Sequence, residues 1–175
     1  MIANRSMLNG SERPVVTYAR LLRRLHELID RNQRETPEAE AVADEMDKPW
    51  QLLTEQERER VGGLAEDLYA LAESGPKTFA MSAPEVAAWH AEAQRMRDSR
   101  LLDLNPDAAL AFLRRPHPPD LPPDAIPFMQ GRCWERLGDD ETALVFYREA
   151  ARLNHRTAST VITILEKKAG HNSCF

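Results

Sequence analysis

Hydrophobic positions recur at helical spacing in one segment of the chain after another. Between residues 14 and 33, leucine and isoleucine return every three or four positions while arginine and glutamate fall between them, which is the pattern of a helix with one apolar face. No segment alternates with the two-residue period of a strand. We expect about eight helices, near residues 14–33, 36–48, 54–75, 83–100, 105–115, 125–137, 140–153 and 157–169.

Short polar residues and prolines mark the ends of several of these helices. Thr54 with Glu57, and Ser82 with Glu85, have the three-residue spacing of a capping box, in which the side chain and backbone of each pair exchange hydrogen bonds. Pro49 disfavours a helical backbone in the residue before it. The second helix is therefore predicted to end ahead of Pro49.

A proline-rich segment, "PHPPDLPPDAIP", covers residues 116–127, and six of its twelve residues are proline. Because proline lacks the backbone N–H and fixes φ, this segment is predicted to be an extended, rigid spacer between helical units. Its PxxP spacing leaves open a second role, as a ligand for the aromatic groove of another protein.

Composition agrees with an all-α fold and narrows the classes of partner. Aromatic residues make up only 6% of the chain, hydrophobic residues 42%, and the net charge is −5. This acidic balance argues against a nucleic-acid partner, which needs a basic face. There is no apolar run of membrane-spanning length and no apolar core of a signal peptide near the start, so we expect a cytoplasmic protein without a membrane partner.

Charge is distributed unevenly along the N-terminal part. Residues 12–34 hold six arginines and three acidic residues, whereas residues 35–73 hold twelve acidic residues and three basic ones. The simplest interpretation is that these segments pack as neighbouring helices with complementary charge. The basic stripe could instead contact RNA or an anionic membrane.

Candidate chemistry is sparse. The five histidines are dispersed, none lies three or four residues from another histidine or a cysteine, and no phosphate-binding loop, nucleophile elbow or zinc motif is present. We therefore predict a non-enzymatic protein with no metal and no cofactor. The pair Gly62-Gly63 inside a helical pattern indicates a close helix contact or a kink. Trp50 is interpreted as a core residue, with an exposed anchor for a partner as the alternative.

An internal repeat is visible when "NPDAALAFLRR" is placed over "DDETALVFYRE". Asn105 aligns with Asp139, and every later pair, including Ala109 with Ala143, is offset by 34 residues. A helix-turn-helix period of 34 residues is that of tetratricopeptide repeats. The segment 124–157 resembles that family through its small, aromatic and turn positions, which are Gly131, Trp134, Leu137, Gly138, Asp139, Ala143, Tyr147, Ala150 and Leu153.

The earlier copy, about residues 90–123, departs from the family pattern. Arg97 and Arg100 occupy the places of Gly131 and Trp134, so the first helix of that unit must pack differently. The stretch 46–71 resembles an uncharacterised helical module of bacterial proteins that often precedes such repeats. We expect a flexible start over residues 1–13, a helical bundle over 14–75, a repeat array over 83–170 and a tail over 171–175.

The resemblance implies a binding module, an adaptor or scaffold that holds a peptide or helix of another protein in a groove. By repeat position the groove residues would be Gln94, Phe128, Arg132, Glu135, Arg136 and Ile162. A mixed apolar and cationic groove suits an amphipathic or acidic segment. One alternative is a structural protein that buries the same faces in a homo-oligomer. Another is that the N-terminal helical bundle covers the face of the first helices.

Overall fold

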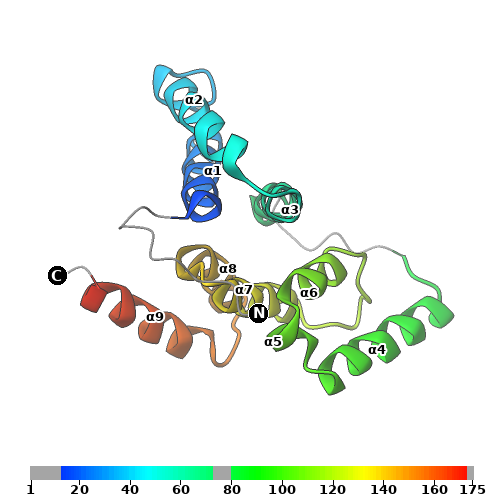
Figure 1. Cartoon of the computed structure of the whole chain (residues 1–175). Helices are drawn as coiled ribbons and strands as arrows, with labels where there is room; N and C mark the ends of the chain where they lie inside the picture. Colours follow the sequence, from blue (N-terminus) through cyan, green and yellow to red (C-terminus); the bar gives the residue numbers. More distant parts are fainter. Residues whose placement is uncertain (1–12, 73–79, 173–175) are drawn as a thin grey trace, which may run out of the picture. The chain divides into compact units, whose positions relative to one another are not determined.

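The protein is all-helical in the parts that its computed structural model describes, residues 13–72 and 80–172 (Figure 1). Within these ranges there is no strand. The described residues form nine helices, which are α1 (Pro14–Asp30), α2 (Pro37–Leu52), α3 (Glu55–Ala72), α4 (Ala83–Asp98), α5 (Leu101–Leu104), α6 (Pro106–Leu113), α7 (Ala125–Leu137), α8 (Asp140–Arg152) and α9 (Ala158–Asn172). The predicted end of the third helix at residue 75 and most of the predicted tail lie outside the described residues.

The chain divides into two compact units, residues 1–62 and 63–175. The division falls inside α3, between Gly62 and Gly63, whereas the sequence pattern placed the boundary after residue 75. The second part of α3 therefore belongs with the C-terminal unit and not with the N-terminal helices.

In the first unit, α1 and α2 lie side by side (Figure 1). Their apolar faces form a core of buried residues, namely Leu21, Leu28, Ala39, Val42 and Met46. Across this contact, Arg24 Nη2 lies 3.0 Å from Glu38 Oε1. The two helices thus share a charge contact of the kind predicted, but both side chains are exposed, so the pair adds little stability.

The predicted end of α2 is wrong, because the helix continues through Pro49 to Leu52. Proline within a helix removes one backbone hydrogen bond. That loss is offset by burial of the Pro49 ring and by the contact of Trp50 with Tyr18, whose ring centroids are 5.4 Å apart. The interpretation of Trp50 as a core residue is also wrong: the side chain is 39% exposed, and the Arg58 guanidinium lies 5.3 Å from its ring centroid.

Both predicted capping boxes are present. At the start of α3, the Thr54 N–H donates to Glu57 Oε2 at 3.0 Å, and the Glu57 N–H donates to Thr54 Oγ1 at 3.3 Å. At the start of α4, the Ser82 N–H and hydroxyl donate to Glu85 Oε2 at 2.7 and 2.6 Å. These bonds hold the pKa of Glu85 below its usual value.

In the second unit, α7 and α8 form a tightly packed hairpin. Trp134 and Tyr147 are each only 1% exposed, and a Cβ added at Gly131 would lie 2.8 Å from the Tyr147 ring. The turn between the helices uses Gly138 in the left-handed region, with φ of 81°, a conformation that glycine adopts without strain. Asp139 then caps α8, because its Oδ1 accepts the Thr142 N–H at 2.9 Å.

The preceding helices follow a different course. α4 ends at Asp98, and Arg100 adopts a left-handed backbone with φ of 54° before the short helix α5. The sequence pattern did not predict α5. The next helix, α6, begins where it was expected, and Asn105 Oδ1 accepts the Ala108 N–H at 3.2 Å.

The proline-rich segment is folded, so the prediction of an extended spacer is wrong. The Leu121 N–H donates to the Pro118 carbonyl at 3.2 Å, and the Ala125 N–H donates to the Pro122 carbonyl at 3.0 Å. Proline at the second position of such a turn has its φ already set, and the ring of Pro118 is buried. The segment therefore packs onto the second unit instead of spanning free space.

Candidate functional site

Four of the six predicted groove residues lie on α7, and two of them point to the same carboxylate. Arg132 Nη2 lies 3.6 Å and Arg136 Nη2 lies 2.9 Å from Oδ1 of Asp103 on α5. Arg136 is exposed and Arg132 is half-buried. One carboxylate cannot neutralise two guanidinium groups, so Asp103 matches the charge of this arginine pair only in part.

The other two α7 residues are held by neighbours of the same unit. The ring of Phe128 stacks on His155, with centroids 3.7 Å apart and planes 11° apart, and lies 5.4 Å from the Tyr147 ring. Glu135 Oε2 accepts the Tyr147 O–H at 2.7 Å. Burial of the phenol, together with Glu135, raises the pKa of Tyr147. Phe128 and Glu135 are thus fixed in position.

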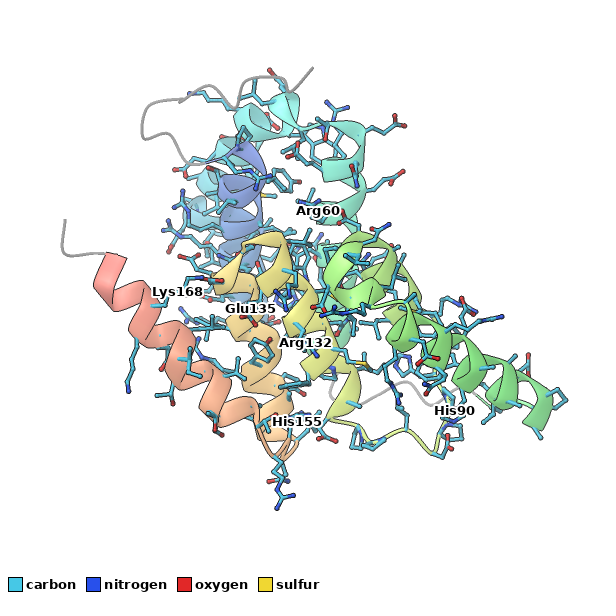
Figure 2. All side chains as sticks on the ribbon, turned by 60° about the horizontal axis from the view of Figure 1, so that its bottom comes forward. Arg60, His90, Arg132, Glu135, His155 and Lys168 are labelled. Atoms are coloured by element: carbon cyan, nitrogen blue, oxygen red, sulfur yellow. The ribbon has the colours of Figure 1, made fainter. Side chains whose placement is uncertain are left out.

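These α7 residues form what we call the α7 face, defined by Phe128, Arg132, Glu135 and Arg136. Figure 2 shows Arg132 and Glu135 on α7, together with His155 in the α8–α9 connection and Lys168 on α9. Lys168 Nζ lies 2.6 Å from Asp140 Oδ2. The described side chains around the α7 face therefore carry both signs of charge.

The remaining two predicted groove residues lie on other helices. Gln94 Nε2 donates to Asp98 Oδ1 at 2.8 Å along α4. Gln94 lines a cavity of about 250 Å³ together with Trp89 and Met129. Ile162 is half-buried on α9. The α7 residues thus form the continuous part of the predicted site.

A second polar cluster, which the sequence pattern did not reveal, lies in the interior of the C-terminal unit. The Asp67 carboxylate, with 4% of its side chain exposed, accepts hydrogen bonds from Arg114 Nε at 3.1 Å, Arg114 Nη2 at 2.9 Å and Gln130 Nε2 at 3.1 Å. It joins the second part of α3 to α7 and to the residue that follows α6. Burial raises the pKa of Asp67 to about 6, and the hydrogen bonds and charge of Arg114 oppose that rise.

Gly63 makes room for this cluster. A Cβ at position 63 would lie 2.2 Å from Cζ of Arg114, so the guanidinium would have to move from its place beside Asp67. A close contact is therefore present at Gly63, but its nearest neighbour is the Arg114 guanidinium and not another helix. Nothing lies within 4 Å of a Cβ added at Gly62, so close packing requires a glycine only at position 63. The glycine pair was the one sequence feature that drew attention to this part of α3.

Beside the cluster lies a cavity of about 420 Å³ within the second unit. Asp67, Arg114 and Gln130 form part of its wall. The proline-rich segment and apolar side chains of neighbouring helices supply most of the rest, namely Leu71, Leu113, Pro118, Pro119, Leu121, Pro122, Pro123, Ile126 and Pro127. A largely apolar cavity with a few fixed polar groups is typical of a small-ligand site.

The described residues offer little reactive chemistry. Cys133 is buried, and burial raises the pKa of its thiol to about 12, so the thiolate that acts as a nucleophile or metal ligand is disfavoured. Over residues 13–72 and 80–172, no group of three or more histidine, cysteine, aspartate or glutamate side chains could hold a metal ion.

Comparison of the chain with family models, curated proteins and solved structures gave no match. In the described part of the chain, no helix combines the length and the apolar character needed to cross a membrane.

Proposed function

We propose that the chain is a non-enzymatic protein–protein interaction module that binds a peptide or helix of a partner on the α7 face. The tetratricopeptide resemblance of residues 124–157 suggests this role. The observation that carries it is the pair Arg132 and Arg136, which share the single carboxylate of Asp103 beside the ring of Phe128.

The support beneath this face is rigid. The interior side of α7 is locked against α8 by the buried rings of Trp134 and Tyr147 and by the close approach at Gly131. A surface that is already ordered loses little conformational entropy when a partner binds. The α7–α8 hairpin therefore suits the display of fixed side chains.

The charge of the face suggests the chemistry of the partner. An acidic side chain of the partner would satisfy the positive charge that Asp103 leaves unmatched on Arg132 and Arg136, and the exposed part of Phe128 would meet an apolar neighbour. We expect the bound segment to be an amphipathic helix or peptide with acidic residues. Electrostatic complementarity of this kind mainly affects specificity and the rate of association.

The experiment compares affinity capture by three versions of the full chain: the native protein, Arg132→Glu with Arg136→Glu, and the control Arg156→Glu. Arg156 is exposed and lies in the α8–α9 connection, outside the four residues that define the α7 face. Partners recovered by the native chain and by the control should be lost from the double variant. Equal recovery by all three would refute the α7 face as the binding surface, and recovery of the chain itself alone would favour the homo-oligomer.

A further inference from the structure

We propose that the cavity of the second unit binds a small ligand with an apolar ring and one positively charged amine. This site is separate from the α7 face and does not depend on the partner-binding function. Three observations carry the inference: the size and walls of the cavity, the pairing of its arginines, and the position of Glu66.

The cavity has a volume and a lining that suit a small molecule. Its volume of about 420 Å³ falls in the range of ligand sites. Pro119 and Pro123 each take the second position of a hydrogen-bonded turn, where the fixed φ of proline keeps the wall in place. An apolar ring would replace water against proline, leucine and isoleucine side chains, which is favourable in proportion to the buried area.

The charges around the cavity are not balanced. Each of the three arginines in the lining is already paired with a carboxylate. These pairs are Arg114–Asp67 at 2.9 Å, Arg115–Glu92 at 2.9 Å and Arg152–Glu149 at 2.6 Å. Glu66 also lines the cavity, and among the described residues it has no ion-pair partner. His117 also lines the cavity, with Nδ1 2.7 Å from the Arg115 carbonyl oxygen. Among the arginines and carboxylates of the lining, the charge left unmatched is therefore negative, which favours a cation over an anion.

Asp67 adds to this preference. It neighbours Glu66 in the same wall, and the charge of Glu66 raises the pKa of Asp67 further than burial alone. A ligand amine placed at these carboxylates would favour the ionised form of both. Because Arg114 and Gln130 already hold the Asp67 oxygens, the exposed carboxylate of Glu66 is the group that would contact the amine directly.

The test uses three probes of similar shape and different charge: 2-phenylethylamine, 3-phenylpropan-1-ol and 3-phenylpropanoate. Each is titrated into the full isotope-labelled chain, and backbone amide shifts are followed by NMR. The amine should shift the amides of cavity residues, including Leu113, Ile126 and Gln130, and should bind about fivefold more tightly than the carboxylate. Equal binding of amine and carboxylate would contradict the assignment, as would the absence of shifts at cavity residues with every probe.

Two variants test whether the Glu66 carboxylate, and not the shape of the cavity, is responsible for the preference for the amine. Glu66→Gln should reduce the preference for the amine over the carboxylate to less than about twofold while binding of the alcohol is unchanged. Glu45→Gln, at an exposed carboxylate of α2 in the other unit, is the control and should retain the full preference. An unchanged preference in Glu66→Gln would overturn the role of Glu66.

Ala70 lines the cavity and is exposed, so Ala70→Trp should fill the opening and abolish the binding of all three probes. Its fold is checked by circular dichroism and by amide shifts away from the cavity. Should that variant fail to fold, the comparison of Glu66→Gln with Glu45→Gln still decides the proposal. Undiminished amine binding by folded Ala70→Trp would place the probe elsewhere and refute the site.

Discussion

The two copies of the repeat agree in their second helices and differ in their first. In both copies the small and aromatic positions of the second helix are buried: Ala109 and Ala143 are 0% exposed, and Phe112 and Phe146 are 6% and 0% exposed. A repeat can therefore keep the packing of its second helix while its first helix packs against different residues.

The first helices show why they diverge. In the later copy, Gly131 lets the Tyr147 ring lie against α7, and Trp134 fills the interior. In the earlier copy arginines take both places, and Arg100 breaks the helix with its left-handed backbone. There α4 supplies Trp89 instead, with its ring centroid 5.0 Å from that of Phe112. An aromatic contact is thus kept although its sequence position has moved.

Replacement of the interior residue Trp134 and of its repeat equivalent Arg100 should give the largest difference in stability loss between the two copies. Trp134→Ala should lower the free energy of unfolding of the second unit by about 4 kcal/mol, because it leaves a large void. The repeat-equivalent change Arg100→Ala should cost less than about 0.5 kcal/mol, since it removes a surface side chain. Denaturant unfolding followed by circular dichroism measures both, and similar losses at the two positions would show that the first helices are equivalent after all.

The aligned arginines offer the second test. Arg114 pairs with the buried Asp67, whereas Arg148 pairs with the exposed Glu166 at 2.9 Å. Arg114→Ala should therefore destabilise the protein by about 3 kcal/mol at neutral pH, because it leaves a buried carboxylate without its cation. Arg148→Ala should cost less than about 1 kcal/mol. An equally small cost at both positions in the same unfolding experiment would rule out a structural role for the buried pair.

Crowding at Gly131 gives a smaller effect. Gly131→Val should lower the free energy of unfolding by about 2 kcal/mol, because the added atoms would meet the buried ring of Tyr147. The matched change at the earlier copy, Arg97→Val, lies at an exposed position and should change stability by less than about 0.5 kcal/mol. Thermal melts of the two variants provide the comparison, and a tolerated valine at position 131 would argue against close helix approach.

The smallest expected effect is a dependence on pH. Burial raises the pKa of Asp67 to about 6 in the folded chain, above its value in an unfolded chain, so the folded state binds more protons between about pH 4 and pH 6. The contribution of Asp67 to stability is therefore greatest below about pH 4 and is lost as the pH rises through about 6. The stability of the native chain relative to Asp67→Asn should thus be greater at pH 4.5 than at pH 7.5, by at most about 2 kcal/mol. A constant difference across that range would mean that Asp67 stays ionised.

Features that depend on neighbours along the chain were predictable. The capping boxes at Thr54 and Ser82 and the hairpin around Gly138 follow from spacings of a few residues, because the groups that meet belong to one helix end or one turn. The continuation of α2 through Pro49 and the folding of the proline-rich segment could not be predicted in this way. At both places, burial of proline rings against other parts of the protein outweighs the local preference of proline.

The cluster of Asp67, Arg114 and Gln130 could not be predicted from the sequence for a related reason. Asp67 lies 47 residues from Arg114 and 63 from Gln130, and no periodicity links residues so far apart. Gly63, which lies against the Arg114 guanidinium, was the one sequence feature near the cluster that the pattern singled out. The α7 positions of the predicted groove, by contrast, follow from the repeat alignment, since Phe128, Arg132 and Arg136 recur at helical spacing on one element.

The most direct measurement determines partner recovery and the free energy of unfolding on the same Arg132→Glu, Arg136→Glu protein. Each of the two arginines forms an ion pair with the carboxylate of Asp103, while the buried side of α7 packs against α8. Loss of partner recovery with an unfolding free energy within about 1 kcal/mol of the native value is the predicted result. Full recovery by a stably folded double variant would contradict the α7 face as the binding surface.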